Sequence, residues 1–180
     1  MQFAAVLAAV LATACGATAS SLPHDPGLSS MTVARSQDTM VVRVAFANAD
    51  FAAASAFDKD GDGVMRANEL NLPMATWCAW ASASVQVTSG ASQTPHACGS
   101  AVAQLGEQDD VELLLTFAVH ADAAAVSMPF LRSLSHGHRC YASLQNQDQH
   151  VILDALLNAR QCTLTLPPES ADTGLSLIHI

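Results

Sequence analysis

The chain has 180 residues, which is enough for one ordinary domain with a substantial core. Its formal net charge is −9, and it contains a single lysine, Lys59, and no run of basic residues. Nucleic acids and anionic membrane surfaces are both bound through positive footprints, so this composition argues against either as a partner.

The first 19 residues are small, apolar and uncharged. They end in the A-x-A pattern of residues 17–19, which predicts a secretory signal peptide. An N-terminal membrane anchor is the alternative, although the apolar run is short for a bilayer span. A lipoprotein signal at Cys15 is a weaker alternative, because the usual leucine at position −3 is missing. We expect residues 20–30 to form a flexible lead-in and the mature domain to be exported, either extracellular or periplasmic.

Export agrees with the cysteine content. Removal of the signal leaves an even number of cysteines: Cys78, Cys98, Cys140 and Cys162. In an oxidising compartment two disulfides are expected, and the pairing Cys78–Cys98 and Cys140–Cys162 closes the shortest loops among the three possible pairings. Free buried thiols are the alternative. No Cys-x-x-Cys occurs, so neither a zinc ribbon nor a thioredoxin-type site is indicated.

The first elements along the chain are two strands, over residues 31–35 and 39–47, which are rich in β-branched side chains. The period then changes to that of a helix, with Asn48 or Asp50 as its expected cap, and this helix leads into an acidic loop. A short exit helix over residues 67–72 precedes Pro73. Three residues at helical spacing follow and are expected to face the core: Met74, Trp77 and Ala81.

Strand signals dominate after residue 83. The expected strands cover residues 85–88, 101–105, 111–120, 125–130, 139–145, 150–156 and 162–166. In the third of these, apolar residues alternate from Val111 to Val119, which indicates one buried face. The sequence therefore predicts a mainly-β fold over residues 31–166, a small β-sandwich with an EF-hand helix–loop–helix at residues 50–72 inserted after the second strand.

Residues 58–69 match every required position of a calcium-binding EF-hand loop, D-x-[DN]-x-[DN]-G-x₅-E. The expected metal ligands are the side chains of the first, third, fifth and twelfth loop residues and the backbone carbonyl of the seventh: Asp58, Asp60, Asp62, Glu69 and Val64. Gly63 permits the sharp turn at position 6. Ca²⁺ is a hard cation that takes six to eight oxygen ligands, and this spacing directs them into one loop. An Asp/Gly-rich turn that binds no ion is the alternative.

Position 9 of the loop is Arg66, which offers no carboxylate, so we expect a water ligand there and a weaker site. The sequence contains one such loop, although EF-hands commonly work in pairs. A lone hand in an exported β-domain indicates a structural clip, because millimolar extracellular Ca²⁺ would fill even a site with a Kd of about 10⁻⁴ M.

Other candidate chemistry is sparse. His136 and His138 flank Gly137 and could bind a transition metal, or they are simply turn residues. No G-x-S-x-G, H-E-x-x-H, P-loop or G-x-G-x-x-G motif occurs, so we do not expect an enzyme.

Several segments together resemble a known family. They are residues 24–29 (HDPGLS), an acidic loop ending in residues 68–70 (NEL), and residues 134–139 (LSHGHR), 141–144 (YASL) and 153–157 (LDALL). This combination is similar to the extracytoplasmic N-terminal region of HupE/UreJ-like membrane proteins, over about residues 24–166. The resemblance implies an exported β-domain with an inserted EF-hand-like loop, followed by transmembrane helices and suspected of a role in transport.

No membrane bundle follows in this chain, and its end offers an explanation. Residues 167–180 form a tail, and residues 175–180 (LSLIHI) match the translation of a transposase sequencing adapter. We interpret that end as an artefact, with a natural apolar end as the alternative. The leading function is thus Ca²⁺ binding by the exported part of a membrane protein. A self-contained secreted calcium sensor or adhesive module, and an exported metal-handling enzyme, are the alternatives.

Overall fold

The computed structural model describes residues 27–36, 38–90, 94–119 and 123–168. Of these residues, 46% lie in strands and 19% in helices, which confirms the predicted mainly-β class. The predicted signal peptide (1–19) and the segment interpreted as an adapter (175–180) lie outside the described residues.

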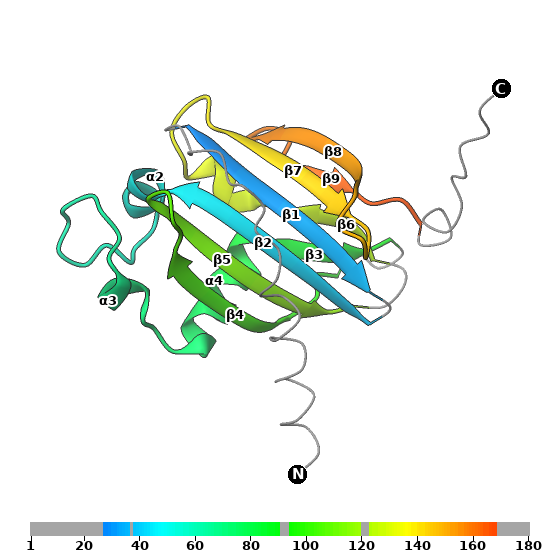
Figure 1. Cartoon of the computed structure of the whole chain (residues 1–180), viewed down its shortest axis with the longest axis horizontal. Helices are drawn as coiled ribbons and strands as arrows, with labels where there is room; N and C mark the ends of the chain where they lie inside the picture. The colour runs from blue at the N-terminus through cyan, green and yellow to red at the C-terminus, as the bar shows by residue number, and fades with distance from the viewer. Residues whose placement is uncertain (1–26, 37, 91–93, 120–122, 169–180) are drawn as a thin grey trace, which may run out of the picture.

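One layer of the molecule is a six-stranded sheet in the order β4-β5-β2-β1-β7-β8 (Figure 1). Its strands are β1 Leu28–Ser36, β2 Thr39–Ala47, β4 Cys98–Leu105, β5 Asp110–Ala118, β7 Arg139–Gln145 and β8 Val151–Asn158. Neighbouring strands are antiparallel except β1 and β7, which run parallel in the middle of the sheet. This parallel pair joins the first and last thirds of the domain.

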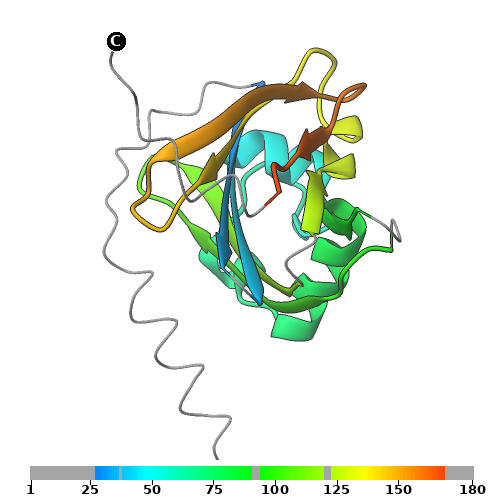
Figure 2. The same cartoon turned by 90° about the vertical axis from the view of Figure 1, so that its right-hand side faces the viewer.

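The second layer combines helices with a small sheet, as the edge-on view of the large sheet shows (Figure 2). The small sheet has the order β3-β6-β9, with β3 Gln86–Ser89, β6 Ala123–Ser127 and β9 Thr163–Thr165. The helices are α2 Asn48–Ala54, α3 Ala67–Leu70, α4 Met74–Ser84 and the 3₁₀ helix η2 Pro129–Arg132. Two sheets are present as expected, but helices cover much of the large sheet in place of a full second sheet.

The alternation read from the sequence of β5 is confirmed. Its odd-numbered residues from Val111 to Phe117 are completely buried, and Val119 is nearly so. They pair with β2, whose inward residues are also buried, so the two strands form the floor of the core. Burial of alternate side chains on neighbouring strands fixes the register, because a one-residue slip would turn every apolar side chain to the wrong face.

Aromatic side chains fill the space between this floor and the helices. Phe51 of α2 lies at the centre, with its ring centroid 5.6 Å from Phe46, 5.6 Å from Trp80 and 5.8 Å from Phe130. Phe57, just before the acidic loop, lies 4.5 Å from Trp77 of α4. Large aromatic surfaces contribute most of the burial energy of a core, so this aromatic cluster fixes α2 and α4 on the sheet.

Some local predictions are wrong. β1 begins at Leu28, within the expected flexible lead-in, because residues 28–30 pair with residues 139–141 of β7. The strand expected over residues 125–130 ends at Ser127, and Pro129 begins η2 because it lacks a backbone N–H for the ladder. Trp77 and Ala81 are buried as expected, whereas Met74, the first residue of α4, is 55% exposed.

Candidate functional site

The acidic loop follows α2 and ends in α3, so a helix–loop–helix segment lies directly after β2 (Figure 1). Within it, Gly61 and Gly63 adopt φ values of 71° and 80°. Glycine reaches this left-handed region without the cost that a Cβ imposes. The second of these is the sixth loop residue, where the calcium-loop pattern requires glycine. The chain therefore turns sharply where the pattern predicts.

Backbone N–H groups hold the carboxylates of the loop. Asp58 accepts hydrogen bonds from the N–H of Gly61 at 2.8 Å and of Gly63 at 2.9 Å. Asp60 accepts one from Asp62 N–H at 3.2 Å, and Asp62 accepts one from Val64 N–H at 2.9 Å. The bond from Gly63 is the main cause that lowers the pKa of Asp58. The bonds to Asp58 favour its ionised carboxylate, the form that binds a metal ion.

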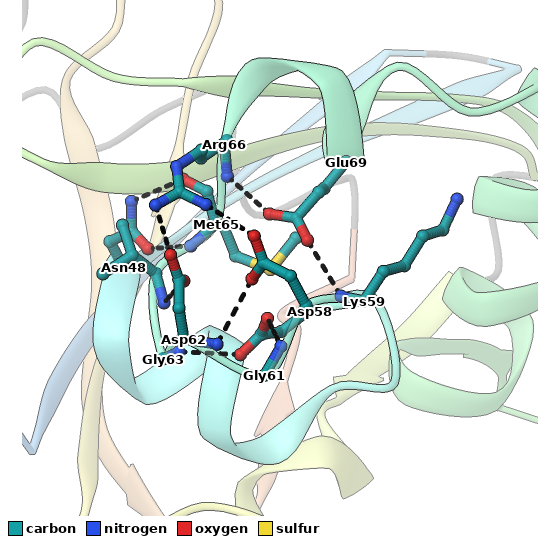
Figure 3. A network of polar contacts seen from close by, with 11 residues as sticks. Asn48, Asp58, Lys59, Gly61, Asp62, Gly63, Met65, Arg66 and Glu69 are labelled. Carbon is teal, nitrogen blue, oxygen red and sulfur yellow. Dashed lines mark hydrogen bonds and ion pairs between the residues drawn. The ribbon is translucent and has the colours of Figure 1, made fainter.

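Glu69 closes the loop from the inside. Its side chain is 4% exposed, and its Oε1 and Oε2 accept hydrogen bonds from Lys59 N–H at 2.8 Å and Arg66 N–H at 2.9 Å (Figure 3). One carboxylate thus joins the start of the loop to its end. A buried carboxylate is costly unless it is well partnered, so these two bonds stabilise its place.

Of the five residues that the sequence proposed as ligands, the structure brings three together. One carboxylate oxygen each of Asp58, Asp60 and Glu69 lies within 4.8 Å of the other two. Asp62 is not part of this group, and its Oδ2 is paired with the guanidinium of Arg66. Val64 lies in the loop at 42% exposure.

Arg66 is the basic loop residue that pairs with the carboxylates of the loop. Its Nη1 lies 2.7 Å from Oδ2 of Asp60. Its other terminal nitrogen pairs with Asp62 (Figure 3). From the sequence alone, position 9 was expected only to lack a carboxylate ligand and to hold a water in its place. In the structure the same residue is a counter-ion for two of the predicted ligands.

A second residue that sequence reasoning misinterpreted is Asn48. Asn48 or Asp50 was expected to cap α2, but α2 has no side-chain cap. The carboxamide of Asn48 instead bonds to the backbone of Met65, inside the loop. The sequence does contain a sign of this contact, because Asn48 is a polar residue between the buried strand β2 and an apolar helix face.

The two histidines of the 136–138 turn lie in different environments. His136 is exposed, whereas His138 is 2% exposed. The Nε2 atom of His138 lies 3.0 Å from Ser29 Oγ, and its Nδ1 lies 3.5 Å from an Asp50 oxygen. Among the described residues, no group of three His, Cys, Asp or Glu side chains close enough to share a metal includes either histidine. The geometry supports a packing role for His138.

The predicted disulfides are not formed. All four cysteines of the described part of the chain are free thiols, and none lies at disulfide distance from another. Cys140 is buried on β7, and burial raises the pKa of its thiol to about 12. Cys162 lies before β9 in the other sheet, 3.8 Å from Arg132. Cys98 neighbours Cys78, but burial first and Cys78 second raise its thiol pKa to about 12, which disfavours the reactive thiolate.

No family model and no curated protein matches the chain. Within the described residues, no helix is long and apolar enough to cross a membrane.

Burial of His138 predicts a pH-dependent stability. Burial lowers the pKa of His138 below its usual 6.5, with Asp50 opposing the shift. Below pH 6.5 the unfolded chain therefore binds a proton that the folded chain does not, so the free energy of unfolding falls as pH drops, by up to about 1.4 kcal/mol per pH unit. Urea unfolding at pH 7.5 and 5.5 should show a smaller loss in His138→Gln than in the wild type. The exposed His150→Gln is the control, and equal losses in all three proteins would contradict the assignment.

Proposed function

We propose that the loop of residues 58–69 binds Ca²⁺ and that the bound ion stabilises an exported domain. The observation that carries the proposal is the convergence of carboxylate oxygens from Asp58, Asp60 and Glu69 within 4.8 Å of one another. Three negative charges at this spacing repel one another unless a cation lies near. All-oxygen ligands suit a hard cation, and the loop pattern favours Ca²⁺ over Mg²⁺, which demands stricter octahedral geometry.

The residues present fit this ion. Asp58, Asp60 and Glu69 would hold it, Asp62 would join on release from Arg66, and the Val64 carbonyl would complete the protein ligands. The ion supplies charge neutralisation, and the residues themselves set the shape of the loop. No step of chemistry on a substrate is proposed.

A stabilising role is supported by how the loop is attached. Met65 and Leu70 are 1% and 4% exposed, and the indole N–H of Trp77 donates to the Leu70 carbonyl at 3.1 Å. Phe57 enters the aromatic cluster at the other end of the loop. Because both ends are packed into the core, an ion that orders the loop also favours the folded domain by mass action.

One observation favours a second function, that of a calcium sensor. A cleft of about 370 Å³ lies between α3, α4 and β4, and its lining includes Leu70, Met74 and Val102. Met74 and Val102 are half exposed, and Leu70 follows the proposed ligand Glu69. A sensor would expose more apolar surface when it binds Ca²⁺, whereas a structural clip would only gain stability.

The proposal extends to the family suggested by the sequence, the HupE/UreJ-like membrane proteins. Two segments that support the resemblance adjoin in the structure, since Leu28 pairs with Arg139 across β1 and β7 and Arg139 N–H donates to the Gly27 carbonyl at 2.9 Å. An alternative to this extension is a self-contained secreted calcium-binding module.

Ca²⁺ should raise the free energy of unfolding. Glu69→Gln should abolish this effect, because it replaces the charged carboxylate that would bind the ion through both oxygens with a neutral amide. At an affinity of about 10⁻⁴ M, about 10 mM Ca²⁺ adds about 2.7 kcal/mol. Thermal unfolding with Ca²⁺ and with chelator measures this, and Glu107→Gln, an exposed glutamate outside the loop, is the matched control. No shift and no heat of binding in the wild type would contradict Ca²⁺ binding. An apolar-surface dye whose fluorescence rises with Ca²⁺ would support the sensor instead.

Arg66→Ala should tighten Ca²⁺ binding, by roughly threefold, because the exposed guanidinium competes with the ion for Asp60 and Asp62. Calorimetric titration measures the affinity, with the exposed Arg160→Ala as the control for the loss of one positive charge. Unchanged binding in Arg66→Ala would show that Arg66 does not compete with the ion, and weaker binding would show that Arg66 assists the loop.

The gene offers a direct test of the family proposal. Genomic sequence downstream of the Gly174 codon should encode apolar segments of about 20 residues, long enough to span a bilayer. Genomic codons for residues 175–180 followed by a stop would contradict the extension and favour the secreted module.

A further inference from the structure

The eighth residue of the loop, Met65, is held in an unusual way. The whole residue is 1% exposed, so its backbone N–H and C=O need partners within the protein. EF-hands commonly work in pairs, in which a second loop can supply such partners, but this sequence contains one loop of that pattern. The partners of Met65 must therefore come from elsewhere in the fold.

They come from one side chain, that of Asn48 (Figure 3). Its Oδ1 accepts a hydrogen bond from Met65 N–H at 2.6 Å, and its Nδ2 donates one to the Met65 carbonyl at 3.0 Å. A carboxamide has the donor and acceptor of a peptide group, so this pair of bonds reproduces one rung between two antiparallel strands. Asn48 is itself 3% exposed, so both bonds are shielded from water.

Asn48 is fixed on its other side by the turn between β4 and β5. Its Nδ2 lies 3.2 Å from Oδ1 of Asp109, and its backbone N–H donates to the Asp109 carbonyl at 3.1 Å. Asp109 has a φ of 56° and directly precedes β5. The N–H donors of Asn48 thus join the acidic loop to the turn that leads into β5 of the large sheet.

The chemistry at this position requires an amide. An aspartate in place of Asn48 keeps the acceptor for Met65 N–H but loses both donors, and it places a carboxylate against the Met65 carbonyl and the Asp109 carboxylate. An alanine leaves the two backbone groups of Met65 without partners, which is costly for buried groups.

We propose that Asn48 takes the part of a second EF-hand: it holds the backbone of the lone loop in the ion-binding conformation without touching the ion. This inference rests on the proposed Ca²⁺ binding. A loop that occupies the competent conformation only part of the time binds with an affinity reduced by that fraction. Asn48 is a positioning residue in this sense, and its effect is on affinity as well as on stability.

The test compares the full chain with Asn48→Ala, Asn48→Asp and a matched control, Asn146→Ala. Asn146 also accepts two backbone hydrogen bonds, from Asp148 and His150, but in the turn between β7 and β8. Calorimetric Ca²⁺ titration at a temperature where all variants are folded should show a roughly tenfold rise in Kd for Asn48→Ala and a larger one for Asn48→Asp. Asn146→Ala should keep the wild-type Kd.

Hydrogen exchange of the Met65 amide provides a second measurement that does not depend on any variant folding. The wild-type amide should be protected without Ca²⁺ as well as with it, because Asn48 and not the ion is its acceptor. Exchange at the rate of an unprotected amide in the Ca²⁺-free protein would overturn the inference, as would equal Kd values for folded Asn48→Ala and the wild type. Absence of Ca²⁺ binding in the wild type, with the Met65 amide still protected, would instead overturn the proposed function and leave Asn48 as the anchor of the Met65 backbone without a role in ion binding.

Discussion

Repulsion among carboxylates is the constraint on which the acidic loop depends. Four acidic side chains fall within residues 58–69, and three of them bring oxygens within 4.8 Å of one another. The fold offsets this repulsion locally, with backbone N–H groups turned toward the carboxylates and with the guanidinium of Arg66. Because these groups offset the repulsion, the loop keeps its shape. A cation that binds the carboxylates must compete with the same groups.

The shape of the loop is set by its contacts with the core of the domain. Phe57 at its start and Leu70 after its end are both tied to Trp77, one through ring packing and the other through the indole hydrogen bond. Asn48 fixes its middle to the large sheet. A twelve-residue loop held at three points loses little further entropy when it gains a ligand, which is the general basis of preorganisation.

The sequence specifies the parts of this site that are encoded by residue type at short spacing. The positions of the aspartates, Gly63 and Glu69 follow from the loop pattern, and the buried face of β5 follows from alternation. Contacts between distant residues are not visible in such patterns. The bond from Asn48 to Met65 crosses 17 residues and the contact between His138 and Ser29 crosses 109, so the first was misread as a helix cap and the second as a turn histidine.

The same limit explains the errors in the fold. Residues 28–30 have a turn-rich neighbourhood, and they are strand only because β7 lies alongside them. The predicted pairing of Cys140 with Cys162 closes a short loop, but Cys140 lies in β7 of the large sheet and Cys162 directly precedes β9 of the small sheet. Tertiary context overrides local preference in both cases.

The parallel pairing of β1 with β7 has a consequence for how the chain is made. Ser29 meets Arg139 across 110 residues of sequence, so on the ribosome the first strand emerges long before its neighbour. Until then β2 pairs with one side of β1, and the other side presents backbone N–H and C=O groups without strand partners, the kind of edge on which chains associate. That edge is covered only when β7 pairs with β1.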